Sequence, residues 1–134
     1  MAGFNWNTFY TIFETKMKKA CSDCKVGRYT TTKPSSFPYC DISLSDNSGG
    51  NYDLQGYEGS TAPMLTISVY STGSLADSTC EKISNVAKAI MLSYGFQCRG
   101  GPMPVTNAAD PSIVRWVSRY QRIFGAGDTL KQLH

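Results

Sequence analysis

The stretch from Met64 to Tyr94 constrains the fold more than any other part of the chain, because its apolar spacing changes once from that of a strand to that of a helix. Leu65, Ile67 and Val69 alternate with polar or tyrosine residues, which is typical of a half-buried strand. After a turn at 71–74, apolar residues recur every three or four positions, at Ala76, Cys80, Ile83, Val86, Ala87, Ile90 and Tyr94. The sequence therefore predicts a strand over 64–71 and a helix over 75–94, which Gly95 ends as its C′ residue.

The N-terminal third predicts a second helix and a second strand. Residues 5–21 carry an apolar stripe at helical spacing, formed by Phe9, Ile12, Phe13, Met17 and Ala20. Residues 38–44 alternate like a strand, with Cys40, Ile42 and Leu44 on one face and Tyr39, Asp41 and Ser43 on the other. Residues 25–36, which lie between these two elements, form either a connection or a short edge strand.

The C-terminal third leaves two alternatives open. A strand begins at Phe96, and we expect the prolines within 100–104 to interrupt it, since proline cannot donate to a central ladder. Residues 110–124 match a helix that starts at Asp110 and Pro111, and they match a strand equally well. As a strand they place Val114, Trp116, Ser118 and Tyr120 on one face and Ile113, Arg115, Val117 and Arg119 on the other.

Together these elements predict a single α+β domain over residues 1–134, with an antiparallel sheet of about four strands and two helices packed on one face. A long glycine-rich loop is expected over 45–63 and a flexible tail over 125–134. No apolar run approaches the roughly 18 residues of a membrane helix, and the N-terminus has no secretion signal. We therefore expect no membrane association.

The residue types needed for catalysis are scarce. The single histidine, His134, is the last residue, which argues against a Ser-His-Asp or Cys-His nucleophile system. The glycine pairs at 49–50 and 100–101 lack the Lys-Ser/Thr and the strand-to-helix setting of a phosphate loop. We expect a protein that is not an enzyme and that uses no cofactor.

Five cysteines, at positions 21, 24, 40, 80 and 98, are an odd number, and we expect free thiols. Cys21 and Cys24 form a lone CxxC at the end of the first helix, without the second ligand pair that a zinc site needs. A redox CxxC belongs at a helix N-terminus instead. The sequence predicts no metal site, small core residues at Cys40, Cys80 and Cys98, and little loss of stability when Cys21 and Cys24 are changed to serine.

Charge is segregated along the chain although the net charge is only +3. Residues 1–35 carry a net +4, residues 36–81 carry six acids and no Lys or Arg, and residues 82–134 carry a net +5. These runs are either solvated faces or complementary surfaces of neighbouring copies. Contacts of the second kind close into rings or grow into filaments, and concentrated positive charge also suits a phosphate backbone.

The order of segments resembles a known family. The strand around Thr66–Ser71 leads into the helix over 76–90, which ends in Tyr94-Gly95-Phe96; a proline-containing link and the run Ile113–Tyr120 follow. This order resembles the tail terminator proteins of tailed bacteriophages, also called tail-to-head joining or tail completion proteins. The helix over 9–17 and the strand over 37–42 also lie where that family has theirs, so the likeness covers about residues 5–123. It implies that residues 112–123 form a strand.

The resemblance implies a hexameric ring that caps the tail tube and joins the tail to the neck. Its partners would be copies of itself, the tail tube protein and a neck or head-closure protein. Genomic DNA would pass through the lumen without being read in sequence. The implied location is the tail–neck junction of the virion, after synthesis in the cytoplasm of the host bacterium. The alternatives are a head-closure or neck adaptor protein, or a small nucleic-acid-binding module, for which a pI of about 8.6 is low. An enzyme that acts through the Cys21–Cys24 pair ranks last.

Two groups of residues are candidates for the subunit interface or the lumen. The acidic and tyrosine residues of the predicted loop suit an interface; they are Asp46, Tyr52, Asp53, Tyr57 and Glu58. The arginines near the C-terminus are the second group, namely Arg115, Arg119 and Arg122. As a strand, their segment places Arg115 and Arg119 on one face and Arg122 on the other; as a helix, it places all three on one face. We expect Arg115 and Arg119 to meet the acidic 36–81 surface of a neighbouring copy, or else DNA.

Overall fold

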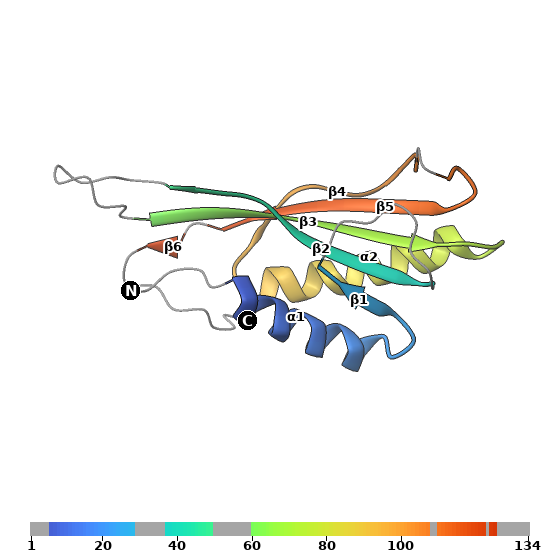
Figure 1. Cartoon of the computed structure of the whole chain (residues 1–134), viewed down its shortest axis with the longest axis horizontal. Coiled ribbons are helices and arrows are strands. Elements are labelled where there is room, and N and C mark those ends of the chain that lie inside the picture. The colour runs from blue at the N-terminus through green and yellow to red at the C-terminus, as the bar shows by residue number, and fades with distance from the viewer. Residues whose placement is uncertain (1–5, 29–36, 50–59, 108–109, 123, 126–134) are drawn as a thin grey trace.

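A computed structural model of the chain describes residues 6–28, 37–49, 60–107, 110–122 and 124–125. Along the chain it contains α1 (Trp6–Ala20), β1 (Lys25–Gly27), β2 (Tyr39–Gly49), β3 (Ser60–Ser71), α2 (Ala76–Ser93), β4 (Gln97–Val105), β5 (Val114–Gln121) and β6 (Phe124–Gly125) (Figure 1). Both helices, and the strands over 38–44 and 64–71, lie where the sequence predicts them. The fold is α+β.

The strands form a mixed sheet in the order β1-β2-β3-β5-β4, and β6 pairs with the start of β3. Every pairing is antiparallel except that of β1 with β2, which is parallel. The sequence predicted about four strands, all antiparallel. The number of strands is therefore wrong, and the direction is wrong for β1, the edge strand beside β2. With three and two residues, β1 and β6 are too short to show an alternating pattern. Gly125, predicted to begin the flexible tail, is paired in β6, and residues 126–134 lie outside the described residues.

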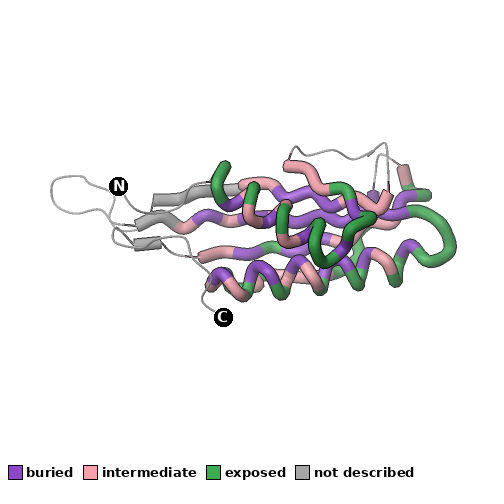
Figure 2. The backbone as a smooth tube through the Cα atoms, turned by 90° about the horizontal axis from the view of Figure 1, so that it is seen from below, coloured by how far each residue is buried: buried purple, intermediate pink, exposed green. Residues whose placement is uncertain are grey.

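Both helices cover the same face of the sheet, as predicted (Figures 1 and 2). Helix α2 packs against β3, β4 and β5, and α1 packs against α2 and β1. The core between the layers includes Phe9, Phe13, Met17, Cys40, Ile42, Leu65, Ile67, Val69, Ala87, Met91 and Tyr120, all fully buried. Neither described helix is long and apolar enough to span a membrane.

Helix α2 ends as its sequence predicts. Gly95 has a φ of +84°, and its N–H donates to the carbonyl of Leu92 at 3.0 Å. The N–H of Phe96 donates to the carbonyl of Met91 at 3.1 Å, which completes a Schellman motif. The ring of Phe96 then folds back into the core, 5.2 Å from the ring of Phe9. This contact ties the end of α2 to α1.

The ambiguous segment after residue 110 is a strand, and the helical alternative is wrong. β5 lies between β3 and β4 in the sheet, so both of its edges are paired. Its helix-facing side chains dock on α2: the indole N–H of Trp116 donates to the carboxylate of Asp77 at 2.8 Å. Asp110 begins a turn instead of a helix: the N–H of Ile113 donates to its carbonyl at 3.0 Å, the N–H of Ser112 donates to its carboxylate at 3.0 Å, and β5 follows directly.

The predicted interruption at 100–104 is also wrong, because β4 runs through it along the edge of the sheet. An edge strand tolerates prolines, since one of its sides forms no ladder. The pairing with β5 shifts register on both sides of Gly100, and Gly101 has a φ of +73°. A Cβ at Gly101 would lie 2.2 Å from the carbonyl oxygen of Val117, so only glycine permits this close approach.

The end of β2 and the start of β3 form a ribbon that continues past the helices, and β6 pairs with its β3 side (Figure 1). β2 extends to Gly49 and β3 begins at Ser60, so the predicted loop over 45–63 is wrong at both ends. The glycine and proline content of this stretch suggested a loop, whereas cross-strand pairing with a long neighbouring strand overrides that local preference. Residues 50–59 lie outside the described residues.

Candidate interaction surface on the helix-free face

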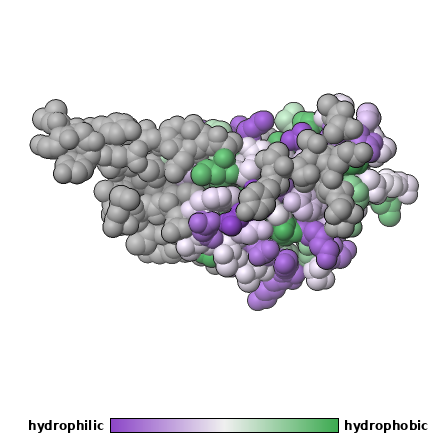
Figure 3. All heavy atoms as spheres, viewed as in Figure 1, coloured by the Kyte–Doolittle hydropathy of each residue, from purple (hydrophilic) through white to green (hydrophobic). Residues whose placement is uncertain are grey.

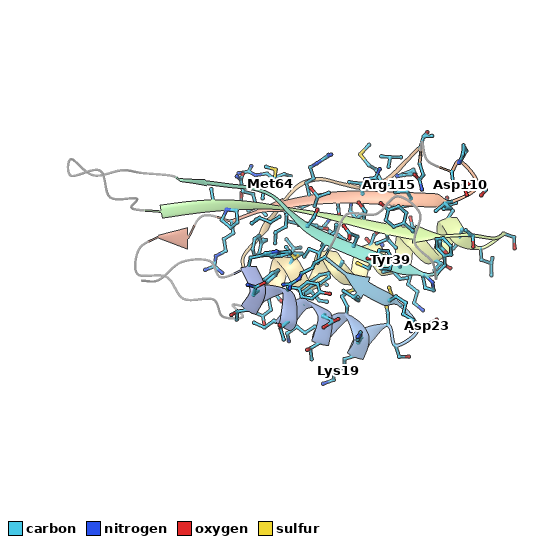
Figure 4. The ribbon with its side chains drawn as sticks, in the orientation of Figure 1. Lys19, Asp23, Tyr39, Met64, Asp110 and Arg115 are labelled. Carbon is cyan, nitrogen blue, oxygen red and sulfur yellow. The ribbon has the colours of Figure 1, made fainter. Side chains whose placement is uncertain are left out.

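The face of the sheet opposite the helices carries a row of polar side chains across β2, β3 and β5. Asp41 on β2 is opposite Ser68 on β3, and Tyr70 on β3 is opposite Arg115 on β5. Directly opposed residues of antiparallel strands point to the same side, so these four side chains share one face. In Figure 4, Tyr39 on β2 and Arg115 on β5 lie on either side of β3.

Arg115 is held by contacts on this face. Its guanidinium carbon lies 5.7 Å from the centre of the Tyr70 ring, and its Nη2 donates to the hydroxyl of Ser68 at 3.3 Å. The ring of Tyr39 lies 6.2 Å from that of Tyr70 and extends the aromatic surface. The Nε of Arg115 is buried and has no hydrogen-bond partner. Arg115 is thus a half-buried, oriented cation.

Asp41 is buried on the face that the sequence predicts to be solvated. Its side chain is 2% exposed, and its Oδ1 has no hydrogen-bond partner. Burial raises the pKa of Asp41 to about 7, although Arg115 acts in the opposite direction. Sequence reasoning missed this residue because an acid in an alternating strand is normally exposed. The available signal was the pair Tyr39 and Tyr70, two large aromatic residues on the predicted polar face.

A shallow groove of about 180 Å³ lies between β4 and β5 on the same face. Met103 and Val105 are exposed at 52% and 37%, and Val117 forms a buried floor between the strands. Arg115 and Arg119 line the groove from β5, as predicted for a strand that puts them on one face. None of the described residues that line this groove is acidic. It therefore combines apolar contact with positive charge.

Arg122 lies on the other face, also as predicted for a strand. Its Nη1 donates to the carbonyl of Tyr94 at the C-terminus of α2. Cations are favoured there by the helix dipole, so this contact has a structural role. Together with Arg99, it lines a separate groove of about 270 Å³ where β4 begins and β5 ends. Arg122 is therefore not brought together with Arg115 and Arg119.

Hydrophilic side chains also gather over α1, along the lower edge of the molecule in Figure 3. Lys16, Lys18 and Lys19 lie on this helix, and Lys18 forms an i,i+4 ion pair with Glu14 at 3.5 Å. A mixed and exposed charge pattern of this kind is typical of a solvated helix face. It lacks the apolar component of the β4–β5 groove.

The acidic candidates are only partly placed. Asp46 lies in β2 opposite Met64, on the ribbon beyond the helices. The other four candidates of that group lie outside the described residues, namely Tyr52, Asp53, Tyr57 and Glu58. Of the two groups in the predicted contact, the structure therefore describes the basic one, at Arg115 and Arg119.

Four cysteines converge on the core. Cys21, Cys24, Cys40 and Cys80 are buried as free thiols, and Cys98 is half-buried. Burial raises the pKa of Cys24 and of Cys80 to about 12 and that of Cys40 well above its ordinary value. Among the described residues, no group of three or more His, Cys, Asp or Glu is arranged to hold a metal ion. The burial of Cys21 and Cys24 argues against the expectation that serine is harmless there, because serine would bury a hydroxyl.

Comparison with known proteins returned no protein-family model and no curated protein that matches the chain. The fold and surface define an α+β domain with a mixed sheet that carries an apolar and cationic groove on its helix-free face.

Proposed function

We propose that the chain is a structural virion protein of a tailed bacteriophage, which caps the tail tube and joins the tail to the neck as a hexameric ring. The observation that carries this proposal is β5. Pattern alone left residues 110–124 open, the resemblance to tail terminator proteins requires a strand there, and Val114–Gln121 is a strand. The succession β3, α2, Gly95-Phe96 and β5 also follows the order on which the resemblance rests.

The distribution of surface chemistry supports assembly into a closed ring. A ring that is not built from two-fold contacts joins two different surfaces of each copy, and these surfaces must be complementary. The β4–β5 groove offers a cationic and apolar surface, and the segment 36–81 carries six acids, of which Asp41 is buried, and no Lys or Arg. Such charge complementarity favours the correct register between neighbours.

The function requires no catalytic group, and DNA would pass through the lumen without base-specific contacts. A neck adaptor protein would share these requirements, so the two roles must be separated by what the protein joins. A nucleic-acid-binding module would instead act as a single copy on DNA.

The proposal is tested with phage particles that lack this chain. Cells infected with the deficient phage should accumulate heads and tails that are not joined, and the purified chain should join them in a lysate. Electron microscopy counts the joined particles, and a plaque assay measures infectivity. Normal tails on heads in the absence of the chain would refute the proposal, and a defect confined to the closure of DNA-filled heads would assign the chain to the neck.

A further inference from the structure

Among the described residues of the helix-free face, those of the β4–β5 groove combine exposed apolar atoms with positive charge. Met103 and Val105 project from the edge strand, and Arg119 is exposed beside them. In the described part of the chain, Arg119 has no hydrogen-bond or ion-pair partner. Arg115 also lines the groove. An uncovered surface of this composition suits an extended acidic segment that also carries large apolar side chains.

We propose that this groove binds residues 50–59 of a second copy of the chain, through Arg115 and Arg119. The inference rests on the proposed ring and names the contact that would close it. The segment has the complementary composition: Asp53 and Glu58 are its only charged residues, and Tyr52, Leu54 and Tyr57 are its large apolar ones.

The spacing of the side chains decides which pairs can form. Arg115 and Arg119 are four strand residues apart, about 13 Å, and point to the same side. Asp53 and Glu58 are five residues apart, so in an extended segment they point to opposite sides. Glu58 can then form a charge-assisted hydrogen bond with Arg119, while Leu54, four residues away on the same side, lies level with Arg115 and contacts the apolar part of the groove.

The segment of the same copy cannot make this contact. Gly49 pairs with Thr61, so both ends of the chain between them start from nearly the same point, and six residues of extended chain can reach at most about 22 Å from it. Arg115 is level with Tyr70, nine residues along β3 from Thr61, which is about 30 Å. The two arginines are thus accessible together only to a neighbouring copy.

The test uses the full-length chain and a synthetic peptide of residues 50–59 with blocked ends. We expect the peptide to shift the backbone amide resonances of Val105, Val117 and Arg119 in a nuclear magnetic resonance titration. A peptide with Asp53→Asn and Glu58→Gln should bind at least tenfold more weakly. Arg119→Glu in the full-length chain should weaken binding of the unmodified peptide to a similar degree.

Arg99→Glu is the matched control, because Arg99 is an exposed arginine on β4 that lines the other groove. It should leave the affinity for the peptide within about twofold. The inference is overturned if the peptide does not bind, if its shifts map outside the groove, or if Arg99→Glu and Arg119→Glu weaken binding equally.

The peptide titration and the joining of heads to tails can fail separately. If the peptide binds the groove but the purified chain joins no particles, the proposed function is wrong and the contact stands. If particles are joined but Arg119→Glu binds the peptide normally, the function stands and the contact is wrong.

Discussion

At the scale of single residues, the helix-free face of the sheet departs most from its sequence pattern. Asp41 occupies the outward position of an alternating strand, yet it is buried with an unsatisfied oxygen. An unpaired buried carboxylate is costly, and the protein limits this cost by keeping the group protonated through a raised pKa. The chain therefore carries a titratable group whose ionisation destabilises the fold.

Asp41→Asn should remove this effect. Between pH 4 and pH 7 the folded chain keeps a proton on Asp41 that the unfolded chain has released, so the free energy of unfolding falls as the pH rises. We expect the asparagine variant to be more stable than the parent at pH 8 by about 2 kcal/mol, with about 4 kcal/mol as the upper bound for a shift of three units. At pH 4 the two proteins should be similar.

Urea denaturation of parent and variant across this pH range gives the difference, in which the contributions of all other carboxyl groups cancel. A difference in stability that does not change with pH would show that Asp41 ionises normally.

Gly101 and Gly100 form a matched pair on the edge strand. Gly101→Ala should destabilise the chain by about 2–4 kcal/mol, because it combines a left-handed φ with a Cβ placed 2.2 Å from a backbone oxygen. Gly100→Ala should change the stability by less than about 1 kcal/mol, since no atom lies within 4 Å of its Cβ. Thermal denaturation ranks the two variants, and equal losses would show that the bulge of β4 adapts to a side chain.

At the scale of elements, the helices and β3 were predictable because each is long enough to repeat its period several times. The seven apolar positions between Ala76 and Tyr94 specify α2, and Gly95 marks its end. β5 was not predictable from pattern, because β-branched residues at 113, 114 and 117 satisfy both periods, and its two neighbouring strands decide the outcome. The prolines of β4 led to the wrong prediction of an interrupted strand for a related reason, since only the topology shows that β4 is an edge strand.

The groove was predictable only in part. The side of β5 that carries Arg115 and Arg119 follows from alternation. Their apolar neighbours Met103 and Val105 come from a segment in which the prolines predicted an interruption of the strand.

Packing of α1, β2 and α2 should protect three thiols in the native chain. The thiolate is the reactive form, and burial raises the pKa of Cys24, Cys40 and Cys80 far above neutrality. We expect these three to remain unlabelled by a maleimide at pH 7.5, while the half-buried Cys98 serves as the internal reference. After unfolding, all five cysteines should react without reductant. Mass spectrometry locates the labels, and rapid native labelling of Cys24 or Cys40 would contradict the packing.

At the scale of the whole molecule, the basic and acidic segments of the sequence can be located on the fold. The basic C-terminal segment contributes the groove on the helix-free face, and the acidic segment contributes the ribbon of β2 and β3 that projects past the helices. One copy cannot bring the tip of its ribbon to both of its own arginines, so the two surfaces are available for contact between copies.

A charge exchange tests this contact in the assembled state. Arg119→Glu should reduce the yield of joined particles at least tenfold, and adding Glu58→Arg to the same chain should restore most of the yield. Arg99→Glu, outside the groove, should join particles normally. If Arg119→Glu joins particles but blocks the passage of DNA, the residue faces the lumen, and if neither step changes, Arg119 is part of a solvated face.

Electron cryomicroscopy of tail tubes incubated with the purified chain tests the ring most directly. We predict a single six-fold ring of about 88 kDa, six copies of the 14.7 kDa chain, at one end of each tube. Tubes with two bare ends, in a sample where the chain remains a monomer and binds DNA, would contradict the proposed function.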